Sequence, residues 1–128
     1  MTKRNNIIYW LATALFCFGM LASGIAQLRQ SVEMQEIITH LGFPLYIMYI
    51  VGVWKLLGVT AILVPKLGLL KEWAYAGFFF LMSGALISHL FMGDVGNAVF
   101  GPLFQLVFIM LSWYFRPQHR KVNVTPAV

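Results

Sequence analysis

Four long apolar segments, separated by short polar ones, dominate the pattern of the chain. They cover residues 7–28, 45–64, 74–92 and 97–115, and each is close to the ~20 residues that a helix needs to cross a bilayer. The short connections between them favour antiparallel neighbours. The pattern therefore predicts an all-α membrane protein that forms one domain, an antiparallel bundle of four transmembrane helices. Pro102 leaves two starts open for the fourth helix, one near Gly101 and one earlier with a local distortion.

The connection between the first two segments has a helical pattern of its own. Over residues 31–42, apolar side chains recur at the spacing of one helix face, at Met34, Ile37, Ile38 and Leu41. Ser31 can cap the start of such a helix and Gly42 suits its end. We expect a short amphipathic helix, and two placements stay open: it lies on the membrane surface, or it forms a lid over the outer mouth of the bundle.

Composition agrees with a membrane protein. The chain is 60% hydrophobic and only 10% charged, with a mean hydropathy of +0.79, whereas soluble domains average about 25% charged residues. The net charge of +5 does not indicate nucleic acid as a partner, because the basic residues lie at the ends of apolar segments. The single cysteine, Cys17, excludes dithiol redox chemistry within one chain. Residues 116–128 form a polar tail that we expect to fray.

Lysine and arginine predict the orientation. Seven of them fall on one side of a four-span arrangement and only Arg29 on the other; the seven are Lys3, Arg4, Lys66, Lys71, Arg116, Arg120 and Lys121. Positive residues favour the cytoplasmic side. Aromatic residues at the same helix ends are typical of an interfacial belt, namely Tyr9, Trp10, Trp73, Tyr75, Trp113 and Tyr114. We therefore expect a multi-pass protein of the inner cell membrane, with both termini cytoplasmic and the first segment kept as a signal anchor.

One residue stands out within the second segment. Lys55 lies about 15 Å from either end of that segment, near the membrane midplane. Insertion of a charge at this depth costs at least about 2.5–3.5 kcal/mol, so a lysine here indicates a functional site or a partner. Gly52 and Gly58, each three residues away, suggest that Lys55 faces the bundle.

No acidic residue is predicted at the depth of Lys55, because the only four acids, Glu33, Glu36, Glu72 and Asp94, fall outside the apolar segments. Three alternatives remain for the amine. It is neutral, or it pairs with Glu33 or Glu36, or it meets a ligand beside other polar groups. Candidates for such a ligand site are Lys55, His89, Gln105, Trp54 and Ser83. Our hypothesis is that Lys55 and His89 line one pocket that opens to the outer leaflet.

A second polar group is predicted at the outer mouth of the bundle, formed by Glu33, Glu36, His40 and Asp94. Glu36 and His40 are four residues apart and face the same way on a helix, but this spacing is also a routine surface pair. With no HExxH motif and no dense His/Cys cluster, we expect no metal site. No phosphate-binding loop and no Ser/His/Asp set at one depth is visible, so we expect no catalytic residues and no enzymatic activity of the chain alone.

Three stretches carry a resemblance to a known family: LGFPLYIMYIVGVWKLLG, LKEWAYAGFFF and SHLFMGD, within residues 41–94. They resemble the DoxX-like family of small bacterial membrane proteins. The Trp54–Lys55 pair and the His89 and Asp94 positions belong to this pattern. The resemblance implies a four-helix membrane fold. It implies little about the reaction, since relatives by name include a subunit linked to thiosulfate–quinone oxidoreduction and others that assist membrane-protein assembly.

Three functions are compatible with these observations. The first is a non-catalytic subunit or binding protein for a lipophilic, quinone-like ligand in a membrane redox system, since an apolar bundle with a few polar groups suits such a ligand. The chain would have no intrinsic cofactor, a quinone or lipid as ligand, and membrane lipids and a larger redox complex or a second copy of itself as partners. The alternatives are an assembly factor for other membrane proteins and, less favoured, a small-solute transporter.

Overall fold

The structure is a computed structural model that describes residues 3–121. These residues form five α-helices and one 3₁₀ turn, and no strand. They are α1 (Lys3–Leu28), α2 (Val32–His40), α3 (Ile47–Leu63), α4 (Gly68–Phe91), α5 (Asn97–Tyr114) and η1 (Gln118–Arg120). Helices α1, α4 and α5 are long and apolar enough to cross a membrane, and α3, with 17 residues, is a shorter apolar helix. The prediction of an all-helical membrane protein is confirmed at this level.

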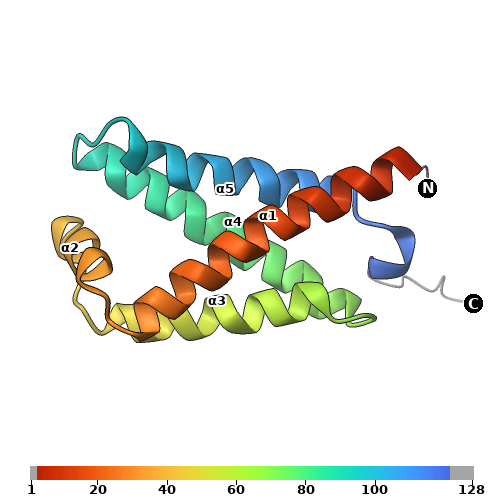
Figure 1. Ribbon diagram of the computed structural model, residues 1–128, viewed down its shortest axis with the longest axis horizontal. Coiled ribbons are helices and arrows are strands. Elements are labelled where there is room, and N and C mark those ends of the chain that lie inside the picture. Colours follow the sequence, from red (N-terminus) through yellow and green to blue (C-terminus); the bar gives the residue numbers. More distant parts are fainter. Residues whose placement is uncertain (1–2, 122–128) are drawn as a thin grey trace, which may run out of the picture.

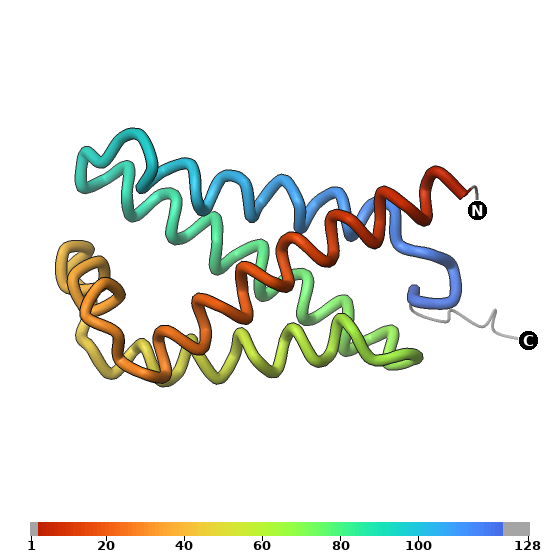
Figure 2. The backbone as a smooth tube through the Cα atoms, in the orientation of Figure 1, coloured from red at the N-terminus to blue at the C-terminus, as the bar shows by residue number. Residues whose placement is uncertain are grey.

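The four longer helices run back and forth along one axis (Figure 1). Helix α1 packs against α3 and α5, and α4 packs against α5 and α3. Residues 3 and 121 lie at one end, which we call the terminal end; α2 and the turn at residues 93–96 lie at the other, which we call the α2 end. Figure 2 shows that α3 and α4 approach each other at the terminal end and diverge toward the α2 end.

The helix boundaries differ from the predicted segments mainly at the terminal end. Helix α4 begins at Gly68, six residues before the predicted start of the third segment at residue 74. The connection from α3 is tight enough for this because Lys66 and Leu67 adopt positive φ angles of 73° and 23°. At the other uncertain boundary, α5 runs from Asn97 with Pro102 inside it, so the earlier of the two starts is the observed one.

The predicted amphipathic helix is present as α2. Ser31 caps its start by accepting a hydrogen bond from the backbone N–H of Met34 at 3.3 Å, and Gly42 follows its end with a φ of 87°. A left-handed backbone at this position favours glycine. No residue of α2 is buried, so few apolar contacts attach this helix to the other four.

Helices α1 and α3 approach each other closely where they cross at Gly24 and Gly52. A Cβ atom on Gly52 would lie 3.0 Å from the carbonyl oxygen of Gly24 and 2.8 Å from Cγ of Leu28. A Cβ on Gly24 would lie 3.1 Å from Cβ of Lys55. Small residues that let backbones approach are typical of membrane helix contacts. Gly52 and Lys55 therefore face the bundle, as expected, and the helix they face is α1. Gly58 faces α4 instead, where it packs against Phe78.

Two basic side chains satisfy the last carbonyl groups of α3. Lys71 donates hydrogen bonds to the carbonyl oxygens of Ala61, at 2.7 Å, and Val64. Arg120 donates to the carbonyl oxygens of Ile62, at 2.9 Å, and Leu63, at 3.3 Å. These groups have no intrahelical partner at a helix C-terminus, where positive charge is also favourable.

The start of the polar tail is therefore ordered rather than frayed. Arg120 is 7% exposed, and its guanidinium lies over the Trp10 ring, 4.8 Å from the centroid. The expectation of fraying was wrong for residues 117–121, because a buried arginine with carbonyl and aromatic partners holds this segment on the bundle. The rest of the predicted tail, residues 122–128, lies outside the described residues.

The core between the helices is apolar, with one buried group of hydroxyls. Its cluster is formed by Phe16, Cys17, Met20, Val59, Ile62, Tyr75, Phe78, Met82 and Ile109. Ser112 is hydrogen-bonded to Thr13, at 2.6 Å, and to Tyr75, at 2.7 Å. Tyr9 and Tyr75 are 0% and 4% exposed, so these two belong to the core and not to the interfacial belt predicted for them.

We predict that Gly52→Ala lowers the free energy of unfolding by about 1–3 kcal/mol, because the added methyl group meets backbone and cannot be accommodated unless α1 and α3 separate. The matched control is Gly84→Ala on α4, where an added Cβ meets nothing within 4 Å and alanine favours the helix. Thermal unfolding in detergent measures both. Equal stability of the two variants would contradict the close crossing.

Candidate functional site

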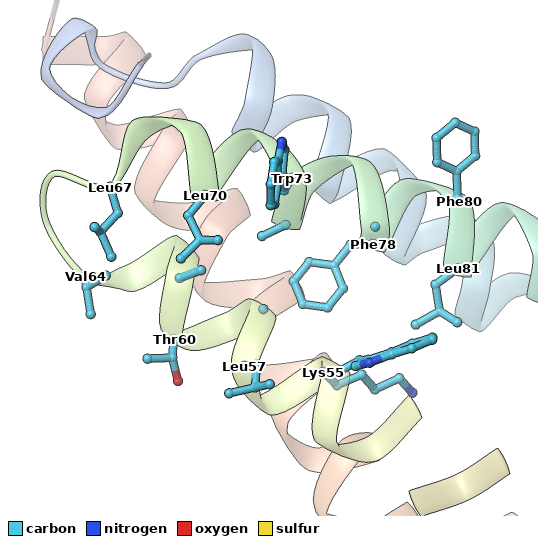
Figure 3. Close-up of a pocket in the computed structure, with 15 residues that line it drawn as sticks. Lys55, Leu57, Thr60, Val64, Leu67, Leu70, Trp73, Phe78, Phe80 and Leu81 are labelled. Atoms are coloured by element: carbon cyan, nitrogen blue, oxygen red, sulfur yellow. The ribbon is translucent and has the colours of Figure 1, made fainter. Parts of the chain in front are cut away.

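An apolar groove with a volume of about 960 Å³ lies between α3 and α4. Figure 3 shows its walls, with Leu57 and Thr60 on α3 and Trp73 and Phe78 on α4. The complete lining is Trp54, Lys55, Leu57, Gly58, Thr60, Ala61, Val64, Leu67, Leu70, Trp73, Ala74, Gly77, Phe78, Phe80 and Leu81. Its size and its apolar lining are those of a site for a lipophilic molecule.

Lys55 is the one basic side chain in the lining of this groove. It is only 4% exposed, and its ammonium Nζ donates a hydrogen bond to the hydroxyl of Ser23 on α1 at 3.0 Å. No carboxylate contacts it within residues 3–121; the three ion pairs of this region involve other residues. Among the described residues, Lys55 therefore does not pair with Glu33 or Glu36, which was one of the three alternatives.

The other ligand candidates are divided. Trp54 lines the groove beside Lys55 and is 62% exposed. Ser83 does not line it, and its hydroxyl donates to the carbonyl oxygen of Phe80 in its own helix at 3.0 Å. Gln105 lies against α1, where its Nε2 occupies the space that a Cβ on Gly19 would take. The structure thus brings Lys55 and Trp54 together and leaves Ser83 and Gln105 outside the groove.

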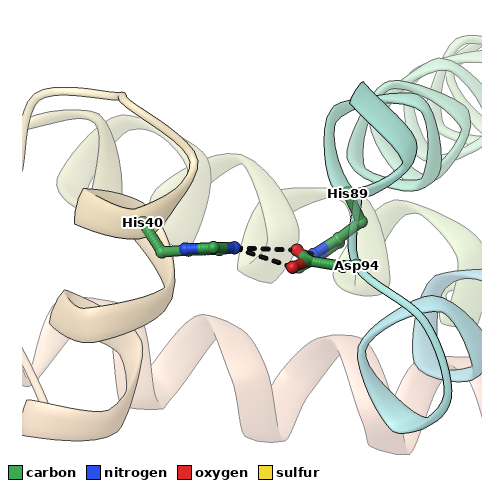
Figure 4. A network of polar contacts seen from close by, with 3 residues as sticks. All are labelled: His40, His89 and Asp94. Carbon is green, nitrogen blue, oxygen red and sulfur yellow. Dashed lines mark hydrogen bonds and ion pairs between the residues drawn. The ribbon is translucent and has the colours of Figure 1, made fainter. Parts of the chain in front are cut away.

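A polar cluster at the α2 end joins α2 to the turn between α4 and α5. Asp94 accepts hydrogen bonds from His40 Nε2, at 2.8 Å, and from His89 Nδ1, at 2.7 Å (Figure 4). Figure 4 shows His40 reaching the carboxylate from α2, whereas His89 reaches it from the end of α4. Glu33 and Glu36 line the same hollow of about 400 Å³. All four predicted outer-mouth residues are therefore brought together, and His89 joins them.

The geometry of this cluster limits its chemistry. An ionised Asp94 only accepts hydrogen bonds, so the ring nitrogens that face it carry the hydrogens. This leaves Nδ1 of His40 and Nε2 of His89 as the ring nitrogens that do not face Asp94. No group of three or more His, Cys, Asp or Glu side chains suited to a metal ion is found in residues 3–121.

Lys55 and His89 do not line one pocket. Lys55 lines the α3–α4 groove and His89 lines the hollow at the α2 end, and no residue is common to the two linings. The divergence of α3 and α4 toward the α2 end accounts for this, because His89 follows α4 away from α3. The single-pocket hypothesis placed both residues by depth alone and did not include this divergence.

Three features of the site were not anticipated from the sequence. Ser23 was not among the predicted ligand-site candidates, yet it is the partner of Lys55. Lys71 and Arg120 were assigned to topology, yet both are buried against α3. One signal was present for Lys71: it lies seven residues after Val64, with a tight Pro65 turn between them, which returns its side chain to the end of the preceding helix.

The fold and the groove define a class, small helical membrane proteins with an apolar groove between two helices. The sequence profile of the DoxX-like family matches residues 11–115. The chain belongs to the DoxX-like family, and the match extends beyond the stretch at residues 41–94 in which the resemblance was visible. No curated protein and no solved structure matches the chain.

The cluster at the α2 end yields a prediction about pH. Hydrogen bonds from His89 and from His40 hold the pKa of the Asp94 carboxyl below its ordinary value of 3.8. A carboxyl with a lowered pKa stabilises the folded state above its ordinary pKa, and this contribution is lost as the pH falls through the lowered value. We predict that Asp94→Asn speeds amide hydrogen exchange in α2 near neutral pH.

The difference between wild type and Asp94→Asn should shrink below pH 3.8, once rates are corrected for intrinsic exchange. Glu33→Gln is the matched control, because it removes a charge in the same hollow without touching the hydrogen bonds of Asp94. Exchange in α2 that is the same in wild type and Asp94→Asn at neutral pH would show that the His40–Asp94 contact does not hold α2.

Proposed function

We propose that the protein is an integral protein of the inner cell membrane that binds a lipophilic, quinone-like ligand in the α3–α4 groove. Lys55 donates a hydrogen bond to a carbonyl oxygen of the ligand, and the apolar walls contact its ring and tail. The observation that carries the proposal is one buried lysine, without a carboxylate partner, in the lining of a mainly apolar groove of about 960 Å³. Thr60 also lines the groove, but its hydroxyl donates a hydrogen bond to the carbonyl oxygen of Leu56 in its own helix.

The proposal includes a fourth membrane crossing by α3. Its 17 residues rise about 26 Å, close to the lower limit for a span. Residues 3 and 121 lie at the same end of the molecule, and this arrangement supports an even number of crossings. We place this terminal end in the cytoplasm, because Lys3, Arg4 and Lys66 are exposed there and positive residues favour that side.

The chain supplies binding and orientation in this proposal, and a partner supplies electron transfer. Neither a metal-binding group nor a pair of cysteines is present in the described residues. A quinone-like ligand would provide the redox chemistry, and the chain would act as a non-catalytic subunit of a larger membrane redox system or as a homo-oligomer.

A second candidate function is docking of another membrane protein, as an assembly factor would do. Gly77 and Gly84 lie seven residues apart on α4, and added Cβ atoms there would meet nothing within 4 Å. Small exposed residues at this spacing favour close packing of a further helix. A transporter remains the least favoured function, since the described residues provide no second bundle for alternating access.

We predict that a short-chain quinone quenches the tryptophan fluorescence of the detergent-solubilised protein to saturation. Trp54 and Trp73 line the groove, whereas Trp10 and Trp113 do not, so a Trp54→Phe/Trp73→Phe variant should lose the saturable part. Lys55→Met should weaken binding roughly tenfold to a hundredfold, since a hydrogen bond from a charged donor contributes about 1.5–3 kcal/mol.

Ser83→Ala is the control for this titration, because Ser83 lies on α4 outside the groove and hydrogen-bonds within its own helix. Its affinity should equal that of wild type. Unchanged affinity of Lys55→Met, or quenching that persists when both groove tryptophans are replaced, would reject quinone binding in the groove. Reproducible co-purification of one larger membrane protein with a ligand-free chain would favour the assembly function instead.

A further inference from the structure

One face of α1, in its half nearer the α2 end, is in contact with polar side chains at Gly19 and Ser23 and carries the polar residue Gln27. We call these three positions the stripe. Gly19, Ser23 and Gln27 are spaced four residues apart, so they lie above one another on the helix. The amide of Gln105 lies against Gly19, and Lys55 donates to Ser23. Gln27 itself is 5% exposed.

Several polar atoms along this stripe are not satisfied by the protein. The side-chain oxygens Oε1 of Gln27 and Gln105 are both buried and have no hydrogen-bond partner among the described residues. The ammonium of Lys55 has three N–H donors, of which the hydroxyl of Ser23 accepts one. Ser23 in turn donates to the carbonyl oxygen of Met20. Acceptors and donors without protein partners therefore lie within one turn of each other.

Buried polar groups of this kind are normally satisfied by water. The stripe reaches the α2 end, because Gln27 is in the last turn of α1, which ends at Leu28. Toward the terminal end, α1 instead presents Phe16, Cys17 and Met20 to the apolar core cluster. An unsatisfied polar group at Gln27 therefore lies between Lys55 and the α2 end, whereas packed apolar side chains lie toward the terminal end.

We propose that the stripe, together with Gln105 and Lys55, forms a hydrated access path that connects the amine of Lys55 with the aqueous phase at the α2 end only. It gives Lys55 contact with water and protons from one side of the membrane. This inference concerns access to the lysine and holds whether or not the α3–α4 groove binds a quinone.

Single cysteines test the path in the full-length protein. In a Cys17→Ser background, Gln27→Cys, Ser23→Cys and Lys55→Cys are each reconstituted in sealed vesicles of known orientation. A charged, membrane-impermeant methanethiosulfonate reagent is then added to either side. We expect labelling from the α2 end, with rates that fall in the order Gln27→Cys, Ser23→Cys, Lys55→Cys, and at least tenfold slower labelling from the terminal end.

The wild-type chain provides a matched control, since Cys17 is 5% exposed and lies on α1 within the apolar core cluster. It should remain unlabelled from both sides. Gln27→Leu combined with Lys55→Cys should slow the labelling of position 55 at least tenfold. Gln30→Leu is the control for this combination, because Gln30 lies at the same helix end and hydrogen-bonds to the backbone of Gln27.

Two results would overturn the proposal. One is labelling of Ser23→Cys and Lys55→Cys that is as slow as that of Cys17 from both sides. The other is faster labelling of either variant from the terminal end. Because the readout is a thiol reaction without any quinone, failure of this test leaves the quinone titration of the Lys55→Met variant to be judged separately.

Discussion

The contact of α1 with α3 at Gly24 and Gly52 is the constraint on which the rest of the structure depends. It brings the two backbones so close that a Cβ on Gly52 would lie 3.0 Å from the carbonyl oxygen of Gly24. At that distance Lys55, one turn after Gly52, lies directly against α1 and reaches Ser23. A lysine near the middle of an apolar helix would otherwise face lipid, where a charge is expensive. The crossing therefore decides that Lys55 is an interior group.

The same principle explains the terminal end of α3. Backbone groups within a membrane must be satisfied by the protein itself, and the last carbonyls of α3 are satisfied by Lys71 from α4 and Arg120 from the tail. Helix α3 is thus held by α1 at Gly52 and by Lys71 and Arg120 at its last turn. Its remaining side forms the groove with α4. The groove is lined mainly by apolar side chains, and Lys55 is the one basic residue of its lining.

Hydrophobic periodicity was sufficient to predict most of the fold. The segments at 7–28 and 97–115, the amphipathic helix with its Ser31 cap, and the inward direction of Lys55 correspond to observed features. The start of α4 at Gly68 was not predicted, because the charged residues Lys71 and Glu72 interrupt the apolar pattern there. In the structure Lys71 is part of the helix, and its side chain folds back to donate a hydrogen bond to α3. The order at Arg120 was also missed, since only tertiary contacts with α3 and Trp10 stabilise it.

The members of the polar cluster at the α2 end were predictable from the sequence, whereas the grouping of the ligand-site candidates was not. Glu33, Glu36, His40 and Asp94 meet at the α2 end as their positions suggested. His89 belongs with them and not with Lys55, because the angle between α3 and α4 separates the two, and no sequence pattern contains that angle. Ser23 could not be distinguished from other small residues until its distance from Lys55 was known.

Native mass spectrometry of the protein released from membranes can detect a ligand bound at Lys55. We expect a bound lipophilic carbonyl compound of one defined mass on wild type and its loss from Lys55→Met, with Ser83→Ala behaving as wild type. A wild-type chain that carries only the phospholipids of its membrane, in the same amounts as Lys55→Met, would contradict this expectation.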